Sequence, residues 1–239
     1  MNTIAMSVMF LRLEILIVSV GFCSGQSLTP DQAVERYLTA SRNRQPECSD
    51  RAFAVQIDAS LSKLKKEGSM SGVKMMSRTG QAVYSGLQFS GDKLVKTAVI
   101  ARFLAREAKP PDRSAGTDVT RRNYSIVYDR TSPYNDLSAY VFRVKPVRKR
   151  KGLFKGELWL DANTADPLRL WGDLVKSPSI FVRQFRFVQD YQRLGDCSQP
   201  LRLLLTVDTR IVGEVEMAVW LHPVDNQSAT DVITETRSQ

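Results

Sequence analysis

Apolar and polar residues alternate along residues 139–174 of this 239-residue chain, which predicts three consecutive antiparallel strands with one apolar side. The first strand should end at Pro146, which has no amide hydrogen to donate to a neighbouring strand. A turn-forming run at residues 161–164 should separate the second strand from the third. The apolar side carries, in chain order, Tyr140, Phe142, Val144, Phe154, Leu158, Leu160, Leu168 and Leu170.

The same alternation of apolar and polar residues extends over most of the chain and predicts roughly ten strands. Earlier strands are expected near residues 53–64, 70–78, 81–89 and 124–128, and long later strands near 181–191, 201–207 and 215–221. Phe185 and Phe187 share one side of the first of these later strands. Turns are expected at residues 65–68, at Thr79-Gly80, near Pro133 and at Gly213, and residues 110–122 read as a long loop or lid.

Two segments have helical periodicity instead. A short amphipathic helix should begin at Thr29, with Pro30 in the first helical position. Asp92 should cap a second helix, which ends before Pro110 and has a wide apolar face that includes Leu94, Ala98 and Ile100. Two helices are few for so many strands, so part of the apolar sheet face could stay open as a cavity for a lipid chain. The alternative is a sheet face filled by its own side chains.

The first 25 residues have the layout of a cleaved secretory signal, with Arg12, an apolar run over residues 15–22, and small residues before Gln26. We therefore expect an exported, periplasmic protein with one domain over residues 26–224 and a polar, disordered tail over 225–239. A lipid anchor at Cys23 is the less favoured alternative, because Phe22 stands where a small residue is expected.

Removal of a signal would leave two cysteines, Cys48 and Cys197, which in an oxidising compartment predicts a disulfide. Two unpaired buried thiols are the alternative. The spacing of the cysteines does not fit a metal site, and His222 is the single histidine. No nucleophile elbow, phosphate loop or histidine pair is present, so we predict a protein that is not an enzyme and that needs no cofactor or metal.

Charge adds a second candidate site. The formal net charge is +9, which favours anionic partners, and a basic run lies at the tip of a predicted hairpin. This run could contact anionic lipid headgroups or an acidic envelope protein, or be a solvated turn. Nucleic acid is excluded as a partner because no binding motif is present and export conflicts with it. The basic residues are Lys145, Arg148, Lys149, Arg150 and Lys151.

Trp159 and Trp171 fall on the polar side of neighbouring predicted strands. They could stack as a cross-strand pair, which we favour, or form a docking patch.

The order of elements, together with Tyr-x-Phe-x-Val-x-Pro at 140–146 and Leu-Trp-Leu-Asp at 158–161 followed by Pro167-Leu168, resembles the outer-membrane lipoprotein-sorting carriers of the LolA and LolB type. The resemblance covers most of residues 29–222. It implies an α+β fold in which a curved antiparallel sheet forms an unclosed half β-barrel covered by a few helices. It also implies a hydrophobic cavity that takes up acyl chains of a lipid or lipoprotein and passes them onward.

We therefore expect a periplasmic carrier that shelters acyl chains for outer-membrane sorting. The alternative is a non-enzymatic envelope interaction module or stress sensor that docks through the basic hairpin. The residues expected to line the cavity are the eight apolar residues of 139–174 named above, with Phe185, Phe187, Leu94, Ala98 and Ile100.

Overall fold

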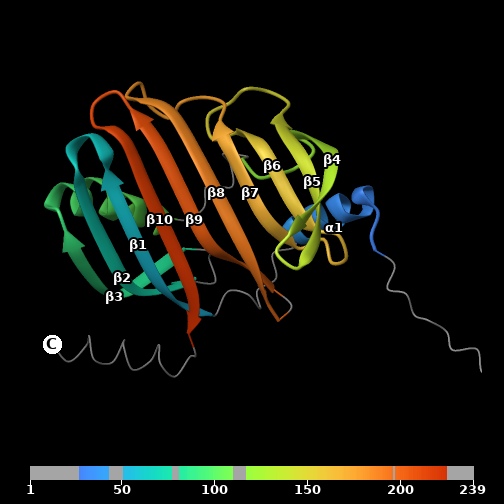
Figure 1. Cartoon of the computed structure of the whole chain (residues 1–239), viewed down its shortest axis with the longest axis horizontal. Coiled ribbons are helices and arrows are strands. Elements are labelled where there is room, and N and C mark those ends of the chain that lie inside the picture. Colours follow the sequence, from blue (N-terminus) through green and yellow to red (C-terminus); the bar gives the residue numbers. More distant parts are fainter. Residues whose placement is uncertain (1–26, 43–50, 77–80, 110–116, 196, 225–239) are drawn as a thin grey trace, which may run out of the picture.

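The structure of this protein, a computed structural model, describes residues 27–42, 51–76, 81–109, 117–195 and 197–224. Its centre is one antiparallel sheet of ten strands in the order β3-β2-β1-β10-β9-β8-β7-β6-β5-β4. Because β3 and β4 stand at the two ends of this order and do not pair, the sheet is not closed (Figure 1). The strands are β1 Ala52–Leu61, β2 Lys66–Met76, β3 Ala82–Gly91, β4 Tyr124–Tyr134, β5 Leu137–Pro146, β6 Phe154–Asp161, β7 Pro167–Leu174, β8 Val182–Leu194, β9 Cys197–Thr209 and β10 Gly213–Val224.

The helical elements lie on one side of the sheet, behind it in Figure 1. Helix α1 (Pro30–Arg42) covers the β5–β6 end, and a second helical segment, a π-helix η3 (Val95–Ile100) continued by α2 (Ala101–Glu107), covers β1 and β2. We call this side the helix-covered face and the opposite side the open face. The α+β architecture with a curved, unclosed antiparallel sheet, which the resemblance implied, is thereby confirmed.

Both predicted helix starts are confirmed by their caps. The Gln32 amide donates to Thr29 Oγ1 at 3.3 Å, and the Thr29 amide donates to Gln32 Oε1 at 2.9 Å, which is a reciprocal capping box. Asp92 Oδ1 accepts the amide hydrogens of Leu94 and Val95.

Two separate hydrophobic cores form between the helices and the sheet. The first joins α1 to β4–β7 through Val34, Leu38, Phe142, Leu158, Leu160 and their neighbours. The second joins η3 and α2 to β1, β2 and β10 through Ile57, Met70, Val95, Ile100, Val219 and their neighbours. Strands β8 and β9 lie between the two cores (Figure 1).

Three sequence-based boundaries were wrong. The expected turn near Pro133 is present at Asn135, which has φ +51°, but the strand predicted near 124–128 continues through Pro133 to Tyr134. An edge strand tolerates a proline because its outward amide position needs no partner. The predicted strand over 53–64 ends at Leu61, and the turn predicted at 65–68 is made by a 3₁₀ turn, η2 (Ser62–Leu64), and Lys65, so that β2 already begins at Lys66.

Residues 1–25, Thr79-Gly80 and the 225–239 tail, for which a signal peptide, a turn and disorder were predicted, lie outside the described residues. Cys197 is buried at the start of β9, and Cys48 also lies outside the described residues. The Cys48–Cys197 disulfide and the domain bounds of 26–224 stay predictions. No helix among the described residues is long and apolar enough to cross a membrane.

Candidate functional site

An apolar strip crosses the centre of the helix-covered face, over β8 and β9 between the two cores and over the adjoining part of β7. In the strand register, Phe185 lies opposite Val207 and Phe187 opposite Leu205, so these four side chains share one face. Each is only half-buried. We define the apolar strip as Leu170, Phe185, Phe187, Leu203, Leu205 and Val207.

The strip touches both cores without belonging to either. Leu170 and Phe187 pack at the margin of the α1 core, while Leu203 and Leu205 pack at the margin of the other core. The amide of Gln189 is the polar group in this row, since Gln189 lies opposite both Leu170 and Leu203. The protein therefore presents a half-buried hydrocarbon surface, with one polar side chain, between two closed cores.

The predicted cavity-lining residues do not all lie together. Leu158, Leu160 and Val144 are fully buried beneath α1, and Ile100, at the end of η3, is fully buried in the second core. Phe142, Phe154 and Leu168 are also buried. Leu170, Phe185 and Phe187 lie in the apolar strip. Half-buried Tyr140 donates its hydroxyl to the Leu28 carbonyl oxygen at 2.6 Å, which ties the chain before α1 to the sheet.

The second helical segment differs from the expected α-helix. Because η3 is a π-helix, Val95 and Ile100 point together into the core, whereas Leu94 is 39% exposed and Ala98 is half-buried. A regular period of 3.6 residues had placed Leu94 on the buried face. Whether these thirteen residues bind lipid stays a prediction.

The residues that sequence reasoning left out of the site are Leu203, Leu205 and Val207. Their alternation in 201–207 was visible, but only the pairing of β9 with β8 shows that they continue the row that starts at Phe185 and Phe187. These three residues could therefore be assigned to the site only once the register between β8 and β9 was known.

The open face also has a hollow, of about 670 Å³, over β1, β2, β9 and β10 and the end of β3. Its lining includes Asp58, Ser60, Ser69, Thr206 and Glu216, and it contains none of the predicted lipid-binding residues. The lining also includes Leu204, Leu205 and Met217, so the hollow is of mixed polarity. Its carboxylates make it a poorer site for a hydrocarbon chain than the apolar strip.

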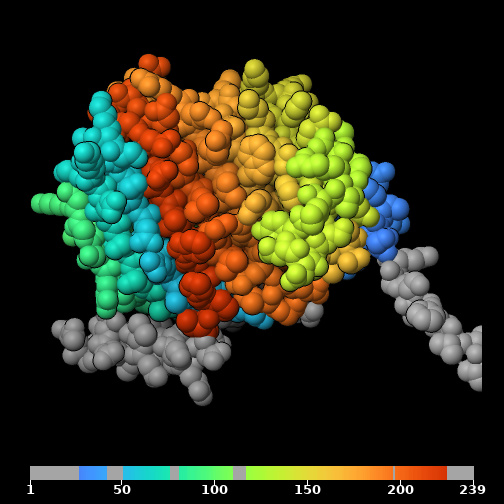
Figure 2. All heavy atoms as spheres, viewed as in Figure 1, coloured from blue at the N-terminus to red at the C-terminus, as the bar shows by residue number. Residues whose placement is uncertain are grey.

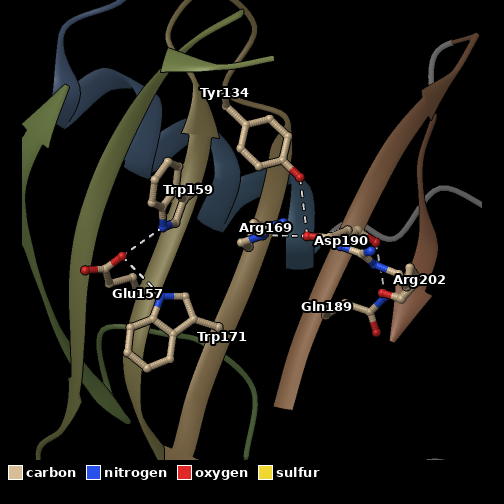
Figure 3. A network of polar contacts seen from close by, with 8 residues as sticks. All are labelled: Tyr134, Glu157, Trp159, Arg169, Trp171, Gln189, Asp190 and Arg202. Atoms are coloured by element: carbon tan, nitrogen blue, oxygen red, sulfur yellow. Dashed lines mark hydrogen bonds and ion pairs between the residues drawn. The ribbon is translucent and has the colours of Figure 1, made fainter. Parts of the chain in front are cut away.

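The rest of the open face is organised by paired charges and aromatic rings. In Figure 2, which looks at this face, α1 appears only at the right margin. Asp190 on β8, whose side chain is 6% exposed, accepts from Arg169 Nε at 2.6 Å and from Arg202 Nη2 at 2.5 Å (Figure 3). The Tyr134 hydroxyl donates to the same carboxylate at 3.3 Å. Four strands are thus tied to one carboxylate.

A second carboxylate joins the two predicted tryptophans. Glu157 Oε2 accepts from Trp159 Nε1 at 2.9 Å and from Trp171 Nε1 at 3.1 Å (Figure 3). The Arg130 guanidinium forms an ion pair with Glu157 and lies 5.5 Å from the Trp159 ring centroid. The tryptophans are therefore a cross-strand structural unit, bridged by a carboxylate.

The pKa values of both carboxyls end below their ordinary range. Burial raises the pKa of Asp190, but the hydrogen bonds from Arg169 and Arg202 lower it by more. For Glu157, burial again raises the pKa, and the hydrogen bonds from Arg130 and the two indoles outweigh it. Both groups are ionised at neutral pH, as paired structural anions.

The predicted basic run lies at the end of the β5–β6 hairpin, with Lys145 in β5 and the other four residues in the loop. Lys145, Arg148, Lys149 and Lys151 are exposed and have no ion pair within the part of the chain that the structure describes. Arg150 differs because it donates to Asn123 Oδ1 at 3.0 Å. Four cations are therefore available to an anionic partner.

The described residues include no group of three or more His, Cys, Asp or Glu side chains with metal-binding geometry.

The similarity of this chain to known proteins is confined to solved structures. No family model matches the chain, and no curated protein matches it. Similar solved structures include a LolA superfamily protein from Nitrosomonas europaea, with 14% identity over 83% of this chain and 95% of that one and a TM-score of 0.37. They also include a putative outer membrane lipoprotein-sorting protein domain from Vibrio parahaemolyticus, with 10% identity, coverage of 82% and 96%, and a TM-score of 0.40. A third is MucB, with 11% identity, coverage of 84% and 95%, and a TM-score of 0.28. The argument for function therefore rests on this chain's own residues.

Proposed function

We propose that this protein is an exported, non-enzymatic carrier that shelters an acyl chain of a lipid or lipoprotein on the apolar strip. The observation that carries the proposal is the half-buried row of Phe185, Phe187, Leu205 and Val207 between two closed cores. An acyl chain laid across β8 and β9 would remove this surface from water, at about 25 cal/mol per Å² of apolar area.

The proposed position differs from a cavity beneath the second helix. Val95 and Ile100 are fully buried there, so that region serves as a core. Between the helices, in contrast, side chains on β8 and β9 keep part of their surface accessible. Occupation of the strip requires no unpacking of either core.

Uptake of a fluorophore-labelled long-chain fatty acid by the full chain tests the proposal. Val207→Glu places a carboxylate in the strip, where a neighbouring hydrocarbon would desolvate it, so affinity should fall by about tenfold or more. The matched control is Thr206→Glu, one residue away on the open face, between Arg186 and Glu216 in the register. The control should bind like the wild type. No uptake by the wild type, or an equal loss in both variants, would overturn the proposal.

A second candidate function, contact with an anionic membrane surface, is favoured by the unpaired cations of the β5–β6 loop. Each such charge can contribute about 1 kcal/mol at an anionic surface. Reversal of Arg148, Lys149 and Lys151 to Glu should abolish co-sedimentation with anionic phospholipid vesicles and leave fatty-acid uptake unchanged. Wild-type binding that is equally strong to neutral phosphatidylcholine vesicles would exclude this function.

A further inference from the structure

The two edges of the open sheet differ in how they are protected against pairing with another strand. An unpaired edge exposes a row of backbone donors and acceptors, and natural proteins block it with charges, prolines or bulges. Strand β4, at one end of the sheet, carries Asp129, Arg130 and Pro133, with a register shift between Tyr128 and Arg130. This edge has three of the usual protections.

Strand β3, at the other end, has almost none of them. Its ten residues, Ala82–Gly91, include no charged residue and no proline. Within the described structure, β3 pairs only with β2. Its irregularities are a register shift opposite Ser71 and Val73, near Gly86, which has φ +59°, and the last residue, Gly91, which has φ +84°. Residues 87–90, between them, form a strand whose outer edge pairs with no described strand.

Exposed apolar side chains lie on the same part of β3 as this outer edge. Leu87 and Phe89 are 39% and 41% exposed, although both lie on the helix-covered face, where Phe89 is opposite buried Met70. Large apolar side chains on a neutral edge strand favour pairing with another apolar, uncharged strand over a charged one.

We propose that β3 is a dimerisation edge, at which β3 of a second copy of this chain pairs antiparallel about a two-fold axis near Gln88. Such an axis places Leu87 opposite Phe89 of the second copy, and Phe89 opposite its Leu87, all on one face of the joined sheet. The same alignment sets Gly86 against Ser90 and brings no two like charges together. A two-fold interface requires one patch that is complementary to itself, and an uncharged strand with Leu87 and Phe89 on either side of the axis meets this requirement, which argues for a second copy as the occupant.

Sedimentation velocity of the full chain, from low to high micromolar concentration, tests the proposal. The wild type should show a reversible monomer–dimer equilibrium. Phe89→Lys would set a cation near its own copy across the axis and should weaken dimerisation by about tenfold or more. Because Phe89 is 41% exposed, the variant should keep the wild-type circular dichroism spectrum and thermal melting.

Val127→Lys is the matched control, since Val127 is a 51% exposed apolar residue on the opposite edge strand β4. It should dimerise like the wild type. A wild type that stays monomeric over the whole range overturns the assignment of a second copy, whatever else pairs with this edge. So does a dimer that Val127→Lys weakens as much as Phe89→Lys, or one that persists when Leu87→Lys and Phe89→Lys are combined.

Discussion

The two faces of this sheet are stabilised in different ways. On the helix-covered face, α1 and the η3–α2 segment close two apolar cores and leave a half-buried strip between them. On the open face no described helix covers the central strands, and Asp190 and Glu157 join neighbouring strands through arginines and tryptophans. Because ion pairs on the open face join strands β7, β8 and β9, these strands do not need a helix packed on their other face. The centre of the helix-covered face can therefore remain accessible to a ligand.

The comparison also separates residues that fold the protein from residues that are free to bind. A fully buried apolar side chain contributes through burial and dense packing, and its removal leaves a cavity. A half-buried side chain in the apolar strip contributes less to stability because water already reaches it. The same apolar residue types therefore have different expected effects in the two places.

The largest expected effect is on the α1 core. Leu158→Ala removes a fully buried side chain and should lower the free energy of unfolding by about 2 to 5 kcal/mol. Val207→Ala, in the apolar strip, should lower it by about 1 kcal/mol or less. Denaturant titration measures both. Equal losses would mean that the strip is part of a closed core.

The second largest expected loss in the free energy of unfolding comes from the open face. Asp190→Ala leaves Arg169 and Arg202 without their shared partner, and because both guanidiniums are about one-third exposed the cost should be about 2 to 3 kcal/mol. Asp208→Ala is the control, since its contact with Arg183 is 3.8 Å long and both side chains are exposed. That variant should unfold within about 0.5 kcal/mol of the wild type. A wild-type-like Asp190→Ala would show that the network does not join the central strands.

Acid should weaken the same network. The native pKa of Asp190 lies below its ordinary value, so this carboxylate stabilises the fold at pH values above about 4 and loses that effect as pH falls through the native pKa. The free energy of unfolding should therefore fall less between neutral pH and pH 3 in Asp190→Asn than in the wild type. Parallel pH profiles for the two proteins would exclude Asp190 as a source of the acid sensitivity.

The smallest effect concerns the tryptophan pair. Trp171→Phe keeps an aromatic ring but removes the indole N–H that Glu157 accepts, at a cost of about 1 kcal/mol. Trp220→Phe is the comparison, because Trp220 contacts Arg202 through its ring and should lose about half as much or less. If Trp220→Phe costs as much as Trp171→Phe, the hydrogen bond to Glu157 is not what distinguishes the pair.

Much of the fold was predictable because strong local signals agree with it. The alternation over 139–174, the capping residues Thr29 and Asp92 and the turn at 161–164 all hold in the structure. Asp161 Oδ1 accepts the amides of Asn163 and Thr164, which explains why that turn was readable from its sequence. The end of β4 was predicted too early because a proline ends a central strand, whereas the edge strand β4 continues through Pro133.

The candidate site was less predictable because it depends on relations between distant strands. Alternation identified Phe185 and Phe187 as apolar-face residues, but it could not separate them from Leu158, which has the same pattern and is closed beneath α1. The π-helix moved Leu94 out of the core, and no residue type signals a π-helix in advance. The Asp190 network requires four strands in register, and it involves residues that individually resemble surface charges.

Photo-crosslinking with a diazirine-bearing fatty acid, followed by peptide mapping, tests most directly whether the apolar strip holds the acyl chain. We predict that labelled sites concentrate on β8 and β9, at Phe185, Phe187, Leu203 and Val207, and that Val207→Glu removes them. Labelling confined to Asp58, Ser69 and Glu216 of the open-face hollow, or to the second helical segment at Ile100, would contradict a carrier that binds between its two cores.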